Sequence, residues 1–329
     1  MMLRTRITDL FGIRYPVIQG GMQNVGYAEL AAAISNAGGL GMLTALTFST
    51  PRALAGEIER CRGLTTAPFG VNISVFPTMR PPDYGAIVDV IADAGIESVE
   101  TAGTPVVREV WDMLFARGIR VIHKCTSVRH AVSSERYGVH AISIDGFECA
   151  GHPGEDDIPG LVLVPAAVDQ LKVPVVASGG IADGRGLVAA LALGAEGVNM
   201  GTRFCATREA PIHEDVKHAY VTNSERDTDL LFRPFRNSAR VGRNALSAEV
   251  LRRIAEPGAT FADVAELVNG ERGRALLQNG DIDSGIYWAS MAQGLIHDIP
   301  SCADLMHRII GEAEAIITSR LPAMTDRRD

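Results

Sequence analysis

The residues best suited to chemistry are concentrated in one short segment, DGFECAGHPGEDD, at positions 145–157. Its thirteen residues include one histidine, one cysteine, three glycines and five carboxylates. The segment directly follows AISI, an apolar run typical of a buried strand. Histidine, whose ordinary pKa is about 6.5, can accept a proton or donate a hydrogen bond near neutral pH. His152, with Gly151 and Gly154 allowing close approach to a flat molecule, is therefore a candidate catalytic base.

Glycines concentrate after two later apolar runs, in ASGGIADGRGLVAALALGAEGVNMGTRF at residues 177–204. Each run is strand-like and is followed by a helix-like segment. Bare backbone N–H groups and the positive amino ends of helices together attract phosphate. The pattern therefore predicts a phosphate site, with simple tight turns as the alternative.

The five cysteines are widely spread and form no CxxC pair. This disfavours disulfides and a structural zinc site and favours a reducing compartment, so we expect no metal. Cys125 and Cys149 have no evident basic neighbour that would lower the thiol pKa. We expect both to be buried or spectator residues rather than nucleophiles.

Eight apolar runs rich in valine and isoleucine organise the first two thirds of the chain, and their starts lie about 20 to 32 residues apart. Most are continuously apolar, which is typical of parallel strands covered on both faces, and the spacing leaves room for one helix between strands. The runs are PVIQGG (16–21), LGMLTA (40–45), FGVNISV (69–75), SVETAG (98–103), RVIHKC (120–125), AISIDG (141–146), VPVVASG (173–179) and GVNMGT (197–202). We predict an α/β fold, a (β/α)8 TIM barrel with its active site at the carboxyl ends of the strands. An open doubly wound sheet is disfavoured because QGGMQNVG lacks a GxGxxG pattern.

The pattern changes after about residue 212, where polar, arginine-rich sequence with a helical period replaces the apolar runs. We predict a barrel over 1–212, a smaller helical subdomain beside the barrel mouth over 213–295, and a C-terminal segment over 296–329. Within that segment, CADLMHRIIGEAEAIITSRL is an amphipathic helix expected to return to the barrel.

The composition is ordinary for a soluble enzyme, with 47% apolar and 21% charged residues among 329. A net charge of −8 argues against a nucleic-acid partner. The amino-terminal segment lacks a signal-peptide core, and no apolar stretch is long enough to span a bilayer. We therefore expect a cytoplasmic protein without membrane insertion, a monomer or homodimer that acts on a small molecule.

Five motifs, taken in order, resemble the nitronate monooxygenase family, also called 2-nitropropane dioxygenases. They are VIQGGM, FGVNIS, VIHKCTS, DGFECAGHPG and the glycine-rich segment after residue 177. The resemblance covers about residues 10–210 and continues weakly through WASMAQGL at 288–295. It implies a barrel, non-covalent FMN and a flavin oxidoreductase activity. The implied reaction is the oxidative denitrification of alkyl nitronates with O2.

The resemblance also implies roles for individual residues. His152 matches the family's catalytic base, and Lys124 would place a cation near the flavin ring, with a barrel-interior ion pair as its alternative role. The implied FMN-binding residues are Gly21, Met22, Gln23, Ser74, Lys124, Ala150, Gly151, Ser178, Gly179, Gly180, Gly201 and Thr202. The expected substrate-pocket residues are Pro77, Arg80, Tyr287, Trp288 and Gln293.

Two features depart from the family pattern. Gly20-Gly21-Met22 stands where members with nitronate activity typically carry an Ala-Pro-Met-like sequence, and the proline-rich PTMRPP (77–82) follows the third run. Both resemble a subgroup that oxidises NADH and reduces quinones. An NAD(P)H:quinone oxidoreductase that uses FMN in a ping-pong mechanism, with NADH as co-substrate, is therefore the alternative. A flavin-free phosphate-binding barrel, either an isomerase or a nucleotide-binding regulator, is the alternative of another class.

Overall fold

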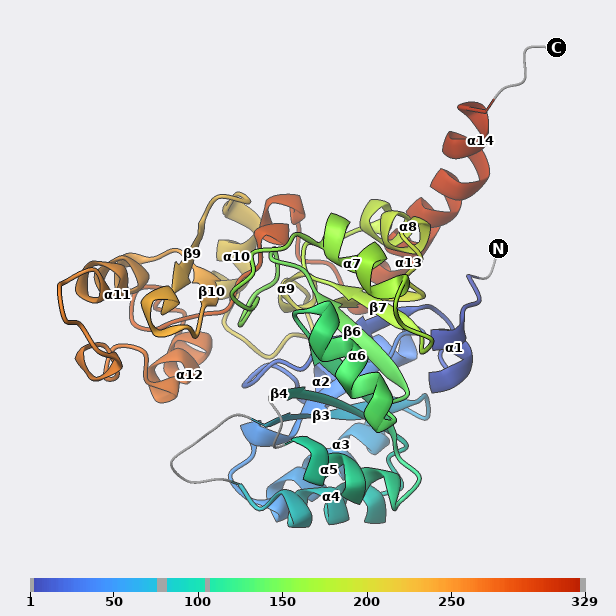
Figure 1. Ribbon diagram of the computed structural model, residues 1–329, viewed down its shortest axis with the longest axis horizontal. Helices are drawn as coiled ribbons and strands as arrows, with labels where there is room; N and C mark the ends of the chain where they lie inside the picture. The colour runs from blue at the N-terminus through green and yellow to red at the C-terminus, as the bar shows by residue number, and fades with distance from the viewer. Residues whose placement is uncertain (1–2, 76–81, 104–106, 326–329) are drawn as a thin grey trace.

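The computed structural model describes residues 3–75, 82–103 and 107–325. Within these ranges eight parallel strands form a barrel surrounded by helices (Figure 1), which confirms the predicted fold. The sheet runs in the order β1-β8-β7-β6-β5-β4-β3-β2, and a parallel bridge between Ile18 and Leu40 joins its two ends. The strands are β1 Val17–Gln19, β2 Gly41–Thr44, β3 Phe69–Val75, β4 Ser98–Gly103, β5 Arg120–Cys125, β6 Ala141–Asp145, β7 Val175–Ser178 and β8 Gly197–Met200.

Every barrel strand lies inside one of the predicted apolar runs, and β3, β4 and β5 have the predicted bounds. The runs become strands because both of their faces are covered, by helices outside and by packed side chains inside. At the amino end of the barrel the interior is apolar. There Ile7 and Phe11, from the first helix, pack against Ile18, Met42 and Ile122. That helix therefore plugs the end opposite the predicted active site.

Several barrel helices begin where the sequence supplies a capping side chain. The side chain of Ser127 accepts a hydrogen bond from the N–H of His130, and that of Asp183 does so from the N–H groups of Arg185 and Gly186. The helices before and between the strands are α1 Arg6–Phe11, α2 Ala28–Asn36, α3 Pro51–Leu64, α4 Tyr84–Asp93, α5 Val107–Phe115, α6 Val128–Tyr137, α7 Gly160–Val168 and α8 Gly184–Ala192.

The segment after β8 contains strands as well as helices. It comprises α9 Thr202–Cys205, α10 Glu214–Thr222, β9 Thr228–Leu231, β10 Ala239–Gly242, α11 Ala245–Ile254 and α12 Gly270–Asn279. The segment predicted as a helical subdomain, 213–295, therefore contains strands that the sequence did not predict, because β9 and β10 form an antiparallel pair. Each strand has only four residues, too few for an alternating pattern to stand out among the surrounding arginines. The pair has its own apolar core around Leu231, Val241 and Val250.

The last long helix, α13 Cys302–Ala315, packs against α8 and α2 on the outside of the barrel. At this contact the side chain of Glu312 accepts a hydrogen bond of 2.8 Å from the N–H of Gly184. The short α14, Leu321–Ala323, then projects away from the body of the molecule (Figure 1).

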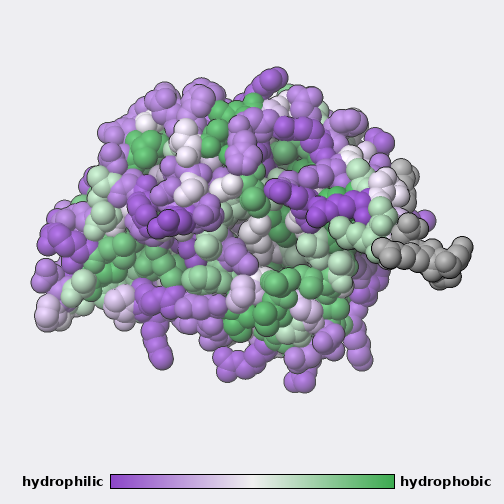
Figure 2. Space-filling view, turned by 90° about the horizontal axis from the view of Figure 1, so that it is seen from above, coloured by the Kyte–Doolittle hydropathy of each residue, from purple (hydrophilic) through white to green (hydrophobic). Residues whose placement is uncertain are grey.

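Hydrophilic side chains border hydrophobic patches on the face shown in Figure 2. In the described ranges, no helix combines the length and the apolar character needed to cross a membrane.

Candidate active site

Lys124 lies at the carboxyl end of β5, and its side chain points toward the ends of the next two strands. Its Nζ is 3.0 Å from Asp145 Oδ1 on β6 and donates a hydrogen bond of 3.4 Å to Ser178 Oγ on β7. Burial works to lower the pKa of Lys124, but the carboxylates of Asp145 and Glu100 outweigh it and hold the pKa above its usual value. Lys124 is therefore a fixed positive charge where three strand ends meet.

Glu100, on β4, organises the loop that follows β1. It is fully buried, and its carboxylate accepts hydrogen bonds from the Gly21 N–H (2.8 Å), Asn72 Nδ2 (2.8 Å) and Asn199 Nδ2 (2.6 Å). These donors come from three different segments, so one carboxylate fixes the ends of β3 and β8 and the Gly21 backbone together. Sequence reasoning missed Glu100, although a lone carboxylate in the apolar run SVETAG was a usable signal.

The Gly20-Gly21 pair is explained by this network. A Cβ atom at Gly20 would lie 2.6 Å from Asn199 Oδ1, and one at Gly21 would lie 2.1 Å from Asn72 Cγ. Larger residues would therefore displace the amides that bind Glu100. Among the neighbouring predicted residues, Met22 donates its N–H to Thr44 Oγ1 at 3.0 Å, while Gln23 is exposed.

The segments after β7 and β8 have the features expected of an anion site. Gly179 and Gly180 have φ angles of 89° and 75°, a conformation that favours glycine. Within the described part of the chain, the N–H groups of Gly179, Gly180 and Gly201 meet no acceptor. Thr202 begins α9, and its Oγ1 accepts a hydrogen bond of 3.0 Å from the Ser290 N–H. Free N–H groups beside Lys124 suit a phosphate-bearing cofactor.

The loop after β6 is fastened to the β9–β10 pair by its backbone. Gly151 and Arg240 form an antiparallel bridge, with N–H···O distances of 3.1 and 2.6 Å. The Arg240 guanidinium also lies over the Phe147 ring, 4.5 Å from its centroid.

Two carboxylates of the same loop complete this attachment. We call the three contacts Gly151–Arg240, Glu155–Ser238 and Asp157–Arg233 together the loop clamp. Glu155 accepts hydrogen bonds of 2.7 Å from both the N–H and the hydroxyl of Ser238. Asp157 forms a two-pronged ion pair with Arg233, at 2.7 and 3.0 Å. Asp157 itself has a φ of 54°, which is uncommon outside glycine.

His152 follows Gly151 in this loop and is exposed. Its ring centroid is 5.8 Å from that of Trp288, with the two planes tilted by 44°. Surrounding protein lowers the pKa of His152, and the nearby Glu155 carboxylate opposes this shift. Because the side chain keeps an exposed face, water limits the size of the shift. His152 is therefore mainly neutral at pH 7 and able to accept a proton.

The remaining predicted residues fall into three groups. Ser74 and Ala150 are half-buried near the mouth, and Ser74 donates a hydrogen bond of 3.3 Å to Asn72 Oδ1. Tyr287 and Gln293 are buried within the segment after β8, where Tyr287 packs against Gly242 and Gln293 Nε2 donates to Ser224 O and Asp227 O. Pro77 and Arg80 lie outside the described residues.

A cavity of about 610 Å³ lies at the other end of the barrel. Its lining includes Phe69, Ser98 and Arg120, the first residues of β3, β4 and β5. In this fold the chemistry takes place at the carboxyl ends of the strands, so we do not assign the active site to this cavity.

Comparison with known proteins gives a family match over nearly the whole chain. The model of the nitronate monooxygenase family matches residues 4–83 and 78–312. A probable nitronate monooxygenase of Staphylococcus saprophyticus is 36% identical, over 69% of this chain and 75% of that protein.

Two other similar proteins cover more of the chain. A (3aS,4S,5R,7aS)-5-hydroxy-7a-methyl-1-oxo-octahydro-1H-indene-4-carboxyl-CoA dehydrogenase of Rhodococcus jostii is 30% identical, over 94% of this chain and 96% of that protein. The structure of FabK from Thermotoga maritima is 33% identical with a TM-score of 0.89, and the match covers 98% of this chain and 99% of that one.

Proposed function

We propose, since the chain belongs to the nitronate monooxygenase family, that this oxidoreductase binds FMN at the barrel mouth and oxidises alkyl nitronates with O2. The observation that carries the proposal is the combination of free N–H groups after β7 and β8 with the fixed charge of Lys124.

The residues present fit FMN in two places. The N–H groups of Gly179, Gly180 and Gly201 would bind its phosphate, because they meet no acceptor among the described residues. Lys124 would lie by the ring, where a positive charge stabilises added electron density. When bound, FMN would supply the electron-accepting group that these side chains lack. The other predicted contacts, at Gly21, Met22, Gln23, Ser74, Ala150, Gly151, Ser178 and Thr202, belong to the same proposal.

His152 would bind the substrate or accept a proton from it. A neutral imidazole can hydrogen-bond the oxygens of a nitronate, or take a proton from the carbon beside a nitro group. The Trp288 ring lies beside the imidazole, with the two centroids 5.8 Å apart, and would form one side of the substrate site. The Gly151–Arg240 bridge holds the backbone next to His152 in place.

A second candidate is the oxidation of a carboxyl-CoA thioester. It is supported by the match to the Rhodococcus dehydrogenase, which spans 94% of this chain and therefore includes the segment after β8. A base that removes a proton close to a carbonyl group would suit this reaction as well, so His152 would keep its role.

The Gly20-Gly21 pair is one of the two sequence features that favour the quinone-reductase alternative. In the structure both glycines pack against the side chains of Asn199 and Asn72. The other feature includes Pro77 and Arg80, which lie outside the described residues. NADH is therefore tested as a third substrate, beside a nitronate and a carboxyl-CoA thioester.

The test is made anaerobically on the purified protein with its bound cofactor. A nitronate, a carboxyl-CoA thioester and NADH are added to separate samples, and the visible flavin absorbance is followed. We expect a nitronate to bleach the absorbance rapidly and to release nitrite when O2 is admitted. Bleaching by the thioester alone would establish the second candidate. Bleaching by NADH that benzoquinone reverses, with nitronate inert, would establish a quinone reductase. A colourless protein that binds no added FMN would overturn the proposal altogether.

A further inference from the structure

The outward face of β5 carries a group of side chains that the proposed reaction does not use. Successive residues of a strand point to opposite faces, so His123 and Cys125 point away from Lys124. They face the helix layer, where His123 contacts Trp111 of α5 and Cys125 lies 4.0 Å from Ser134 of α6. His130, in the first turn of α6, points back toward them.

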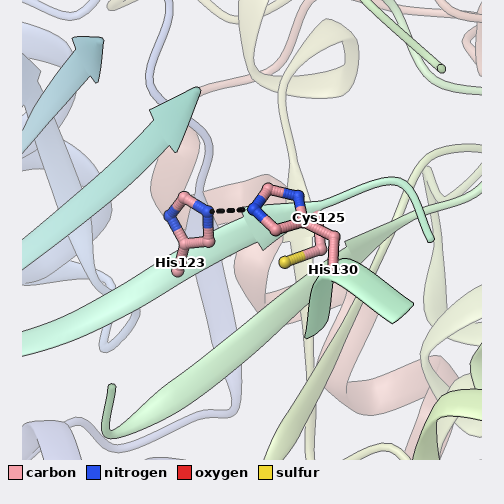
Figure 3. Close-up of side chains that lie close together, drawn as sticks. All are labelled: His123, Cys125 and His130. Atoms are coloured by element: carbon pink, nitrogen blue, oxygen red, sulfur yellow. Dashed lines mark hydrogen bonds between the residues drawn. The ribbon is translucent and has the colours of Figure 1, made fainter. Parts of the chain in front are cut away.

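These three side chains bring metal-binding atoms close together. His123 Nε2 and His130 Nε2 are 3.3 Å apart, and the two nitrogens and Cys125 Sγ all lie within 4.8 Å of one another. Figure 3 shows the two imidazole rings facing each other, with the sulfur beside His130. Two nitrogens bound to one tetrahedral zinc ion, each at about 2.0–2.1 Å, stand about 3.3 Å apart. The two imidazoles are therefore already separated as two ligands of a zinc ion would be.

We propose that His123, Cys125 and His130 form a zinc site that joins β5 to α6, with water as the fourth ligand. Two imidazoles and a thiolate are a ligand set that Zn²⁺ prefers. His130 is only half-buried, so water can reach the fourth position from its side. In a tetrahedral zinc site the sulfur would lie roughly 3.5 Å from each nitrogen, so Cys125 Sγ would move toward the nitrogens by up to about 1.3 Å.

The surroundings of His123 support this assignment. Its Nδ1 lies 2.9 Å from Thr101 Oγ1, which also accepts a hydrogen bond of 3.0 Å from Trp111 Nε1. When Nδ1 donates its proton to Thr101, the lone pair of Nε2 faces His130 and the thiol. Metal-binding histidines are generally oriented by a partner on the other ring nitrogen in this way.

Protonation is also compatible with a metal ion. Burial lowers the pKa of His123 to about 3, and burial together with the Arg129 charge lowers that of His130, so both rings are neutral at pH 7. Burial raises the pKa of Cys125 to about 12, so its thiol keeps its proton until an ion binds. Binding of Zn²⁺ would replace that proton, and about one proton would be released for each ion bound. Lys124 and Arg129 repel a cation, and the new thiolate offsets part of this repulsion.

The experiment measures metal binding on the intact chain with its cofactor. The protein is dialysed against a chelator, titrated with Zn²⁺ in competition with a chromophoric chelator, and assayed for bound zinc after gel filtration. We expect one Zn²⁺ per chain, and at least about tenfold weaker binding in Cys125→Ser and in His130→Gln. Cys61→Ser is the control, because Cys61 is an equally buried free cysteine on α3, outside the cluster.

Co²⁺ provides a second readout that does not depend on affinity. A tetrahedral Co²⁺ site with a sulfur ligand absorbs at longer wavelengths than oxidised flavin, and this absorbance should appear in the wild type and in Cys61→Ser but not in Cys125→Ser.

Less than about 0.1 Zn²⁺ per chain in the wild type would overturn the proposal and leave a direct hydrogen bond between the two histidines. Equal binding by the wild type, Cys125→Ser and His130→Gln would overturn it too. If Cys125→Ser does not fold, zinc binding by His130→Gln alone tests the proposal. This variant should fold, because the side chain of His130 is only half-buried.

Discussion

Lys124 Nζ and Asp145 Oδ1 lie 3.0 Å apart at the ends of neighbouring strands, and Ser178 of the next strand completes the group. The ion pair that was the alternative role for Lys124 is therefore present. The same ion pair keeps Lys124 charged despite burial, which is what a cation beside a flavin ring requires. The two roles support each other.

Lys124→Met should lower kcat/KM with any reducing substrate on the order of 10²-fold, because a fixed charge beside the reacting ring is removed. The bound flavin should also become harder to reduce. Steady-state kinetics and the reduction potential of the bound flavin measure both effects. Lys172→Met, at an exposed position after α7, is the matched control and should change neither. An unchanged potential in Lys124→Met would contradict the proposed contact.

His152→Asn should lower kcat by about 10²–10⁴-fold if His152 is a general base. The wild-type rate should fall as pH drops through a pKa below 6.5, because protein around the ring lowers that pKa and protonation removes the base. The variant should lose this acid limb. A turnover within about threefold of wild type at pH 7 would rule out the base role and leave hydrogen bonding.

Gly179→Ala should weaken FMN binding at least about tenfold and lower the free energy of unfolding by about 1–3 kcal/mol. Its φ of 89° is strained for alanine, and the new Cβ would lie 2.9 Å from Cys149 Cβ. Flavin fluorescence during cofactor titration and urea unfolding measure the two effects. Gly56→Ala, in the open interior of α3, should instead stabilise the protein by about 0.5–1 kcal/mol. Identical behaviour of the two variants would contradict the proposed phosphate site at Gly179.

The Asp157–Arg233 pair of the loop clamp can be tested with a double-mutant cycle. Asp157→Asn and Arg233→Gln should each lower kcat/KM by roughly 3- to 10-fold, and the double variant by no more than either, since all three lose the same contact. Both side chains are more than a third exposed, so the cost in stability should stay below about 1 kcal/mol. Arg252→Gln breaks a comparable exposed pair on α11 and should leave kcat/KM unchanged. Additive losses would show that the two residues act separately.

His123 should make the protein less stable in acid. It stays neutral when folded, down to a pKa of about 3, but binds a proton near pH 6.5 when unfolded. The unfolded state thus binds more protons between about pH 6.5 and 3. Stability should therefore fall as pH falls through this window, by up to about 1.4 kcal/mol per pH unit. Urea unfolding at pH 7 and pH 5, in a chelator, should show a smaller loss for His123→Asn than for wild type. Equal losses would mean that another group is responsible.

The barrel was predictable because its strands are buried on both faces, which leaves continuous apolar runs in the sequence. The proposed phosphate site could be located in the sequence because glycines mark it locally. Glu100 was missed because its three partners lie 28, 79 and 99 residues away along the chain. The loop clamp was missed for the same reason, since Glu155 and Ser238 are 83 residues apart. The proposed zinc site has no pair of cysteines to mark it in the sequence. His123 and Cys125 stand at alternate positions of β5, and His130 lies on the next helix, α6.

The loop clamp also bears on how this family acquires new reactions. The residues that hold the loop are Gly151, Glu155 and Asp157, and none of the clamp bonds involves the side chain of His152. A substitution at position 152 would therefore leave these three bonds of the loop clamp in place. If His152 is the reacting group, as we propose, exchange of that one side chain would change the chemistry on an otherwise unchanged loop.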